Sequence, residues 1–246
     1  MENALLIGLS RQVALARELD VIANNMANVN TNGFKARESR FAEHLMPTAR
    51  ADAFQRPDQR LSYVIDAGTP LDTSAGMIER TGNPLDAAIK GDGYFVVQTA
   101  QGERFTRNGA FEINPQGQLV TSDGHVVQGE NGAIAITPQE SGLVIGADGT
   151  ISSNQGVRGR LRLVRFADGQ SLKNEGANLF SSTAQAQPAG ATSRIEPGAV
   201  ERSNVKPVLE MSRLMEVNRS YAGVAGMLSK MDELRRAAIQ RLSEAA

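Results

Sequence analysis

The chain has 246 residues with 26 basic and 27 acidic side chains, a net charge of -1 and only 4% aromatic residues, a length that allows two modest domains. This even charge and scarcity of aromatics argue against a nucleic-acid-binding surface, which needs a basic stripe and stacking side chains. The chain has no cysteine, which excludes disulfides and thiolate chemistry, and no apolar run approaches the ~18 residues of a membrane-spanning helix.

The first 29 or so residues predict a long amphipathic helix. Its apolar positions recur at alternating steps of four and three, the spacing of one face of a coiled coil, with Gln12 as the one polar interruption. The candidate contact residues on this face are Leu5, Leu9, Ala16, Leu19, Ala23 and Met26. The segment lacks the basic n-region of a secretory signal peptide, so we expect any export to use another route.

Asparagines crowd the expected end of this helix. Asparagine competes with helix by bonding to nearby backbone, and it tolerates left-handed conformations. The Asn-Gly pair that closes the run is a turn signal. Two interpretations stay open, a helix cap or side-chain contacts to neighbouring chains, and the candidates for the second are Asn24, Asn25, Asn28 and Asn32.

Residues 34–75 predict an extended connector with some strand, because Pro47, Pro57 and Pro70 interrupt any regular pattern. Over residues 76–202 the pattern changes to a period of two between glycine-ended turns, which indicates an antiparallel β domain. The expected strands are 94–98, 103–107, 118–121, 125–128, 133–136, 143–145 and 160–166. Residues 176–200, rich in Ala, Gln, Gly, Pro and Ser, are expected to be a return segment.

Residues 203–246 predict a second long helix, with Asn204 as a candidate cap and Pro207 in its first turn. Gly223 and Gly226 lie within it, each costing about 1 kcal/mol relative to alanine. The helix carries a bulky stripe of Leu214, Val217, Tyr221, Val224, Leu228 and Met231. The same spacing continues through Arg235, which interrupts it, to Ala238 and Leu242. A second row, with i, i+3, i+4, i+7 spacing, holds only the small residues Ala222, Ala225, Gly226 and Ser229. We expect a bulky face for one partner and a flat face for close approach of another backbone, the alternative being a helix packed on its own domain.

Together these elements predict an α+β fold. The terminal helices, within 1–33 and 203–246, would pair as a coiled coil, with the antiparallel β domain of 76–202 inserted between them. No phosphate-binding, nucleophile-elbow or zinc motif occurs, and His44 and His125 lack partners at metal-ligand spacing. We therefore expect no catalytic site, cofactor or metal, and no enzyme, although the carboxylate pair of a glycosidase depends on spatial spacing and stays open.

Several segments resemble motifs of the bacterial flagellar rod and hook family. Residues 19–35, LDVIANNMANVNTNGFK, resemble the N-terminal motif of that family. Residues 203–211, SNVKPVLEM, followed by NRSY at 218–221, resemble its C-terminal motif. Residues 91–97, 105–111 and 117–124 are similar to its middle domain. The resemblance therefore covers both ends and much of the centre of the chain.

The resemblance implies a structural subunit of the flagellar basal-body rod, most similar to the proximal-rod members of the family. The helices would line a tube and the β domain would face outward, in a drive shaft that crosses the periplasm and transmits torque from motor to hook. Expected partners are other rod proteins, copies of this chain and the flagellar type III export apparatus. That export needs no cleavable signal peptide. Nucleic acid, a small-molecule substrate and membrane insertion are not expected.

Two alternatives remain at this point. One is a distal-rod paralogue, which the connector at 36–75 would distinguish. The other is a β-rich surface adhesin or binding module on a coiled-coil stalk. An adhesin of this kind predicts a signal peptide and an aromatic binding face, and the β segment is poor in aromatics.

Overall fold

A computed structural model describes residues 2–45, 62–137, 139–167, 172–176, 178–190 and 193–244. The chain divides into two compact units. The helical unit comprises Met1–Met26, Arg37–Pro70 and Lys206–Ala246, and the β unit comprises Ala27–Ala36 and Leu71–Val205. The predicted α+β class, with a helix at each end and a β-rich centre, is confirmed.

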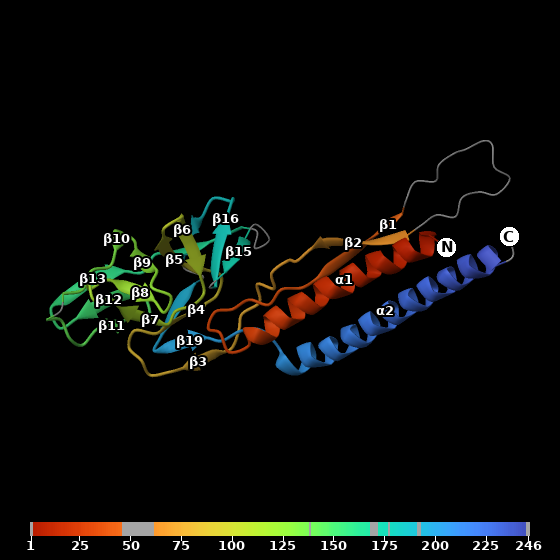
Figure 1. Cartoon of the computed structure of the whole chain (residues 1–246). Coiled ribbons are helices and arrows are strands. Elements are labelled where there is room, and N and C mark those ends of the chain that lie inside the picture. The colour runs from red at the N-terminus through yellow and green to blue at the C-terminus, as the bar shows by residue number, and fades with distance from the viewer. Residues whose placement is uncertain are drawn as a thin grey trace. The chain divides into compact units, whose positions relative to one another are not determined.

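The helical unit contains two long helices, α1 (Glu2–Ala27) and α2 (Pro207–Glu244), which lie side by side and antiparallel (Figure 1). Pro207 opens α2, where its missing N–H and fixed φ suit the first helical turn. The first intrahelical bond runs from the Glu210 N–H to the Lys206 carbonyl at 3.0 Å. Neither described helix is both long and apolar enough to cross a membrane.

The same unit contains a β-ribbon formed by β1 (Arg40–Leu45) and β2 (Ser62–Gly68). The strands pair antiparallel, with Phe41 opposite Asp66 and a bulge between Arg40 and Phe41. The predicted connector is therefore a paired ribbon over much of its described length. Pro47 and Pro57, which supported the connector, lie outside the described residues.

The β unit is built from antiparallel pairs. Its strands are β3 (Ile78–Arg80), β4 (Ala87–Lys90), β5 (Tyr94–Thr99), β6 (Gly102–Thr106), β7 (Phe111–Ile113), β8 (Leu119–Thr121), β9 (Val126–Gly129), β10 (Gly132–Ala133), β11 (Val144–Ile145), β12 (Thr150–Ser153), β13 (Gly156–Arg160), β14 (Leu163–Arg165), β15 (Leu172–Gly176), β16 (Leu179–Ser182), β17 (Gln187–Pro188), β18 (Arg194–Pro197) and β19 (Ala199–Glu201). The main sheet has the order β15-β16-β6-β5-β9-β8-β7, and β14 also pairs with β5.

The return segment at 176–200 contains strands that the sequence analysis did not identify. β18 pairs with β4 and β19 pairs with β3, so the end of the β unit closes against its beginning. These strands have only three or four residues each. Runs this short give no clear period-two pattern, so only the long-range pairing reveals them.

Strand β5 supplies both hydrophobic clusters of the β unit. Phe95 and Val97 belong to one cluster, while Tyr94 and Val96 belong to the other. Phe95 meets Phe111 edge to face, with ring centroids 5.0 Å apart. Alternate residues of a strand point to opposite faces, so the four consecutive buried residues of β5, at 94–97, can hold two layers together.

Candidate subunit interface

Two contacts set the antiparallel pairing of α1 and α2. The Arg213 guanidinium donates from Nε to the Glu18 carboxylate at 3.0 Å. Further along, a side chain built at Gly8 would place its Cβ 2.7 Å from Cδ2 of Leu228. Leu228 therefore packs where α1 has no side chain, and this contact lies within one chain.

The bulky stripe predicted on α2 forms the least exposed side of that helix. Val217 is buried, and the other five members, Leu214, Tyr221, Val224, Leu228 and Met231, are half-buried. Of the predicted small row, Ala225 is half-buried, while Ala222 and Gly226 are exposed. The bulky stripe thus faces largely inward, and the flat row lies largely outside.

The predicted face of α1 is offset from the face that the structure buries. Leu5, Ala16, Leu19 and Met26 are half-buried, whereas Leu9 and Ala23 are exposed. Over residues 5–27, the part of α1 whose exposure is described, the buried positions are Gly8, Ala14, Ile22 and Asn25. A search for large apolar residues misses this face because two of its four members have little or no side chain.

Both helices also carry large apolar side chains on their outer surfaces, which the sequence analysis did not assign to an interface, apart from Leu9. Their exposed fractions run from 49% to 78%. On α1 they are Leu6, Leu9 and Val13, and on α2 they are Val208, Leu209, Met211, Met215, Met227, Leu234 and Ile239. The signal was present, because Val208, Met211, Met215 and Ala222 share one face at steps of three, four and seven. Apolar surface of this extent marks a contact site.

Asn25 is the one predicted asparagine that is fully buried, with 1% of its surface exposed. Its side chain accepts from the Arg37 N–H at 3.0 Å and donates to the Arg37 carbonyl at 2.9 Å. Its Nδ2 also lies 3.4 Å from the Glu210 carboxylate. The Asn25 side chain is therefore used within the chain, where it ties the end of α1 to Arg37.

The other asparagines divide by exposure. Asn24 is exposed, and Asn28 is half-buried with its side chain accepting from the Thr31 hydroxyl at 3.2 Å. Asn32 accepts from the Arg202 guanidinium at 3.0 Å within the β unit.

Asn204 does not cap α2, contrary to prediction. Its Oδ1 accepts from the Ala36 N–H at 2.7 Å, and its Nδ2 donates to the Asp72 carbonyl at 2.9 Å. Its two ends are therefore occupied by two chain segments that lie far apart in sequence.

The turn after α1 is embedded in the β unit. Gly33 has φ +69° and donates its N–H to the Glu201 carbonyl at 2.7 Å. A Cβ at this position would lie 2.4 Å from backbone atoms of both Arg107 and Asn108. Only glycine fits such an approach, so the Asn-Gly pair is a packing requirement as well as a turn.

A buried ion network fixes the next residues. Lys35 donates to the Glu201 carboxylate at 2.7 Å and to the Ser74 carbonyl at 2.6 Å. Arg107 donates to the other oxygen of Glu201 at 3.1 Å and to the Gly91 carbonyl at 2.8 Å. The three charged side chains are 1–4% exposed. Burial lowers the pKa of the Lys35 ammonium, and the neighbouring Glu201 carboxylate opposes that shift.

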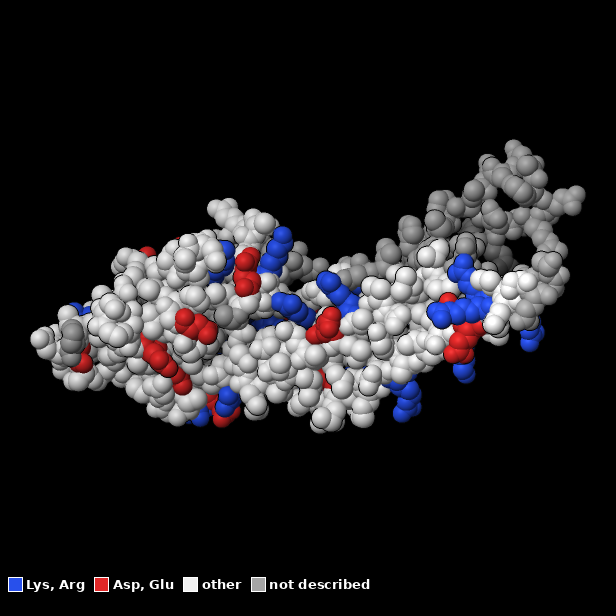
Figure 2. Space-filling view, viewed as in Figure 1, with Lys and Arg blue, Asp and Glu red and all other residues white. Residues whose placement is uncertain are grey.

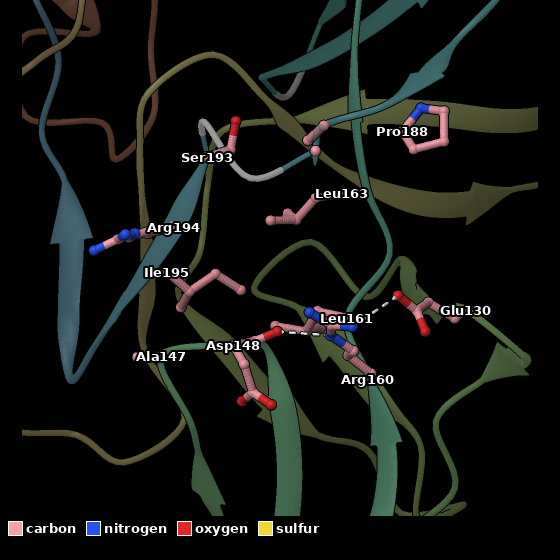
Figure 3. Close-up of a pocket in the computed structure, with 12 residues that line it drawn as sticks. Glu130, Ala147, Asp148, Arg160, Leu161, Leu163, Pro188, Ser193, Arg194 and Ile195 are labelled. Atoms are coloured by element: carbon pink, nitrogen blue, oxygen red, sulfur yellow. Dashed lines mark hydrogen bonds and ion pairs between the residues drawn. The ribbon is translucent and has the colours of Figure 1, made fainter.

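The β unit also has a hollow of about 760 Å³, shown in Figure 3. Two of its charged groups are paired within the chain: Arg160 donates to the Asp148 carbonyl at 2.8 Å and lies 3.6 Å from the Glu130 carboxylate. Across the described residues, no group of three His, Cys, Asp or Glu side chains could hold a metal ion. In the view of Figure 2 the charged side chains form scattered patches rather than one continuous surface.

Comparison with known proteins gives a consistent result along the chain. Residues 5–35 match the family described as flagella basal body rod protein. Residues 88–153 match the flagellar hook protein FlgE/F/G D1 domain, and residues 196–241 match the flagellar basal body rod FlgEFG protein C-terminal domain.

Curated relatives extend over nearly the full length. Flagellar basal-body rod protein FlgF of Caulobacter vibrioides is 40% identical over 247 residues, covering 99% of both chains. FlgF of Salmonella typhimurium is 35% identical, again over 99% of both. Flagellar basal-body rod protein FlgG of Bacillus subtilis is 33% identical over 95% of this chain and 97% of its own length.

Proposed function

This chain belongs to the flagellar basal-body rod protein family and is a structural subunit of the rod, and from that premise we propose that it occupies the proximal rod. Its higher identity to the Caulobacter vibrioides FlgF than to the Bacillus subtilis FlgG favours the proximal position over a distal-rod paralogue. The relatives compared are rod proteins, and none supports the alternative of an adhesin on a stalk. The proposed role is mechanical, in a drive shaft that crosses the periplasm, and it involves no enzymatic activity.

We further propose that α1 and α2 act as a coiled-coil pair on the inside of the rod, with the β unit facing outward. Partners would be other rod proteins and copies of this chain, delivered by the flagellar type III export apparatus without a cleavable signal peptide. In this arrangement the inner helical part would consist of residues 1–33 and 203–246. The connector would be residues 34–75, and the outer β part would be residues 76–202.

One observation carries the assembly proposal: large apolar side chains lie exposed along both helices. Burying a side chain of this size contributes ~1.5–3 kcal/mol, so the set as a whole favours association strongly. Exposed Leu9, Ala23, Asn24, Ala222 and Gly226 remain interface candidates beside them. The half-buried bulky stripe of α2 would serve first to hold the helix pair together.

The outer face of α2 can be tested with Met211→Asp/Met215→Asp, at side chains that are 54% and 58% exposed. The purified variant is expected to keep the stability of the unmodified chain, since both positions face solvent. In cells whose only copy is the variant, export is expected to be normal but swimming absent, because each aspartate would be buried unpaired at a subunit contact.

The matched control places two aspartates at exposed turns of the β unit, in Gln101→Asp/Gln116→Asp, and is expected to swim normally. Normal swimming of the Met211→Asp/Met215→Asp strain would show that this face of α2 is not an assembly surface.

A further inference from the structure

A groove of about 450 Å³ runs between α1 and α2 in the helical unit, lined by Ile7, Gly8, Arg11, Ser220, Gly223, Val224 and Met227. Gly8 is explained within the chain, because Leu228 occupies the place of its side chain. Gly223 has no such explanation within the chain. Apart from the adjoining backbone of α2 itself, no atom lies within 4 Å of the position that a Cβ would take there. The chain therefore leaves space at Gly223 that it does not use, although glycine weakens the helix.

The end of α2 overhangs its partner helix. Gly8 packs against Leu228, and the helices are antiparallel, so α1 begins at about the level of Leu234. By this register the last ~10 residues of α2, about 15 Å, extend past the start of α1. Figure 1 shows the C-terminal end of α2 reaching beyond the N-terminal end of α1. Leu234 is 69% exposed at the start of this overhang, and no described part of the chain covers it.

Charge adds a second element of complementarity. Arg11 lines the groove, is exposed and forms no ion pair with the described residues. Glu233, next to Leu234, is likewise exposed and forms none with them. The overhang thus presents a bulky apolar side chain beside a carboxylate, and the groove presents an unfilled space beside a guanidinium.

We propose that Leu234 of one copy of the chain occupies the groove at Gly8 and Gly223 of the next copy, with Glu233 paired to Arg11. This inference rests on the proposed function and specifies one of its self-contacts. Because groove and overhang are different parts of the surface, about 16 Å apart along α2, the contact is head to tail. A head-to-tail contact repeats into an open helical array or a ring rather than stopping at a dimer.

Cysteine cross-linking tests this contact, since the natural chain contains no cysteine. In Gly223→Cys/Leu234→Cys the two thiols are about 16 Å apart within one helix, too far for the Cα separation of about 4.4–6.8 Å that a disulfide allows. Any disulfide must then join two copies. In oxidised hook–basal bodies from cells with only this variant, we expect a reducible ladder that extends beyond dimers.

The control Ser229→Cys/Leu234→Cys moves one thiol to an exposed position outside the groove and is expected to give no such ladder. Basal bodies that contain the Gly223→Cys/Leu234→Cys chain without a ladder would overturn the contact and leave the rod function intact. Absence of the unmodified chain from basal bodies would instead overturn the rod function.

A second variant fills the groove without disturbing the isolated chain. Gly223→Leu places a side chain in open space, so the purified protein is expected to fold and to keep its helical content. Its incorporation into basal bodies is expected to fall by about tenfold or more, because the contact becomes overpacked. Ser243→Leu, at an exposed position outside the groove, should incorporate normally, and equal incorporation of the two variants would refute the proposal.

Discussion

Replacing Glu201 with alanine is expected to lower the free energy of unfolding by about 3–5 kcal/mol, the loss typical of a broken buried ion pair. Its carboxylate is 1% exposed and is shared by Lys35, Arg107 and the Gly76 N–H, which donates at 2.8 Å. Removing it leaves two buried cations facing each other without an anion. The Lys35–Glu201 ion pair joins the segment that follows α1 to a strand 166 positions later in the chain. The loss of this ion pair should therefore also release the segment that follows α1.

Urea unfolding measures this loss, and amide exchange of β5, β6 and β19 reports on the β unit alone. The matched control is Glu196→Ala, which removes the carboxylate of an ion pair with Arg80 whose side chains are 32% and 82% exposed. Exposed pairs contribute only about 0–1 kcal/mol, so this variant should stay close to the unmodified chain. Similar losses in both variants would mean that the buried network has no special part in stability.

Replacing Gly33 with alanine is expected to cost about 2–5 kcal/mol, from a left-handed backbone, ~1–2, and an overpacked contact, ~1–3. The new Cβ would lie 2.4 Å from Arg107 and Asn108 backbone atoms, which cannot rotate away as a side chain could. The turn after α1 would then leave its site in the β unit.

Gly82→Ala separates the two contributions. Gly82 has φ +76°, close to that of Gly33, but nothing lies within 4 Å of its Cβ position. Urea unfolding of this control should show only the ~1–2 kcal/mol of the left-handed backbone. If Gly33→Ala cost no more than Gly82→Ala, the close approach to Arg107 would carry no energetic weight.

The periodicity of the sequence predicts the two long helices and the longer strands of the β unit. The two long helices were predicted within a few residues of their observed ends, and the 94–98 and 103–107 strands correspond to β5 and β6. These segments repeat at periods of 3.6 or 2 over enough residues for the pattern to be clear. The β1–β2 ribbon and the short strands β18 and β19 depend on pairing between distant segments, which no local window contains.

The candidate interface was predicted only in part, for a related reason. The stripe of α2 from Leu214 to Met231 was recognised by its large side chains, yet Leu228 packs on a glycine of α1, which has no side chain to detect. Asn25 and Lys35 belong to the motif that identified the family, but their roles depend on Arg37 and Glu201, which spacing alone does not link to them. Periodicity predicts which helix faces are apolar, and only the structure shows which of those faces the chain itself covers.

The most direct test of the rod assignment is quantitative mass spectrometry of purified hook–basal bodies from cells that express this chain. The account predicts a handful of copies, present together with the other rod proteins. Complete absence from hook–basal bodies, with the chain found elsewhere in the cell envelope, would contradict it.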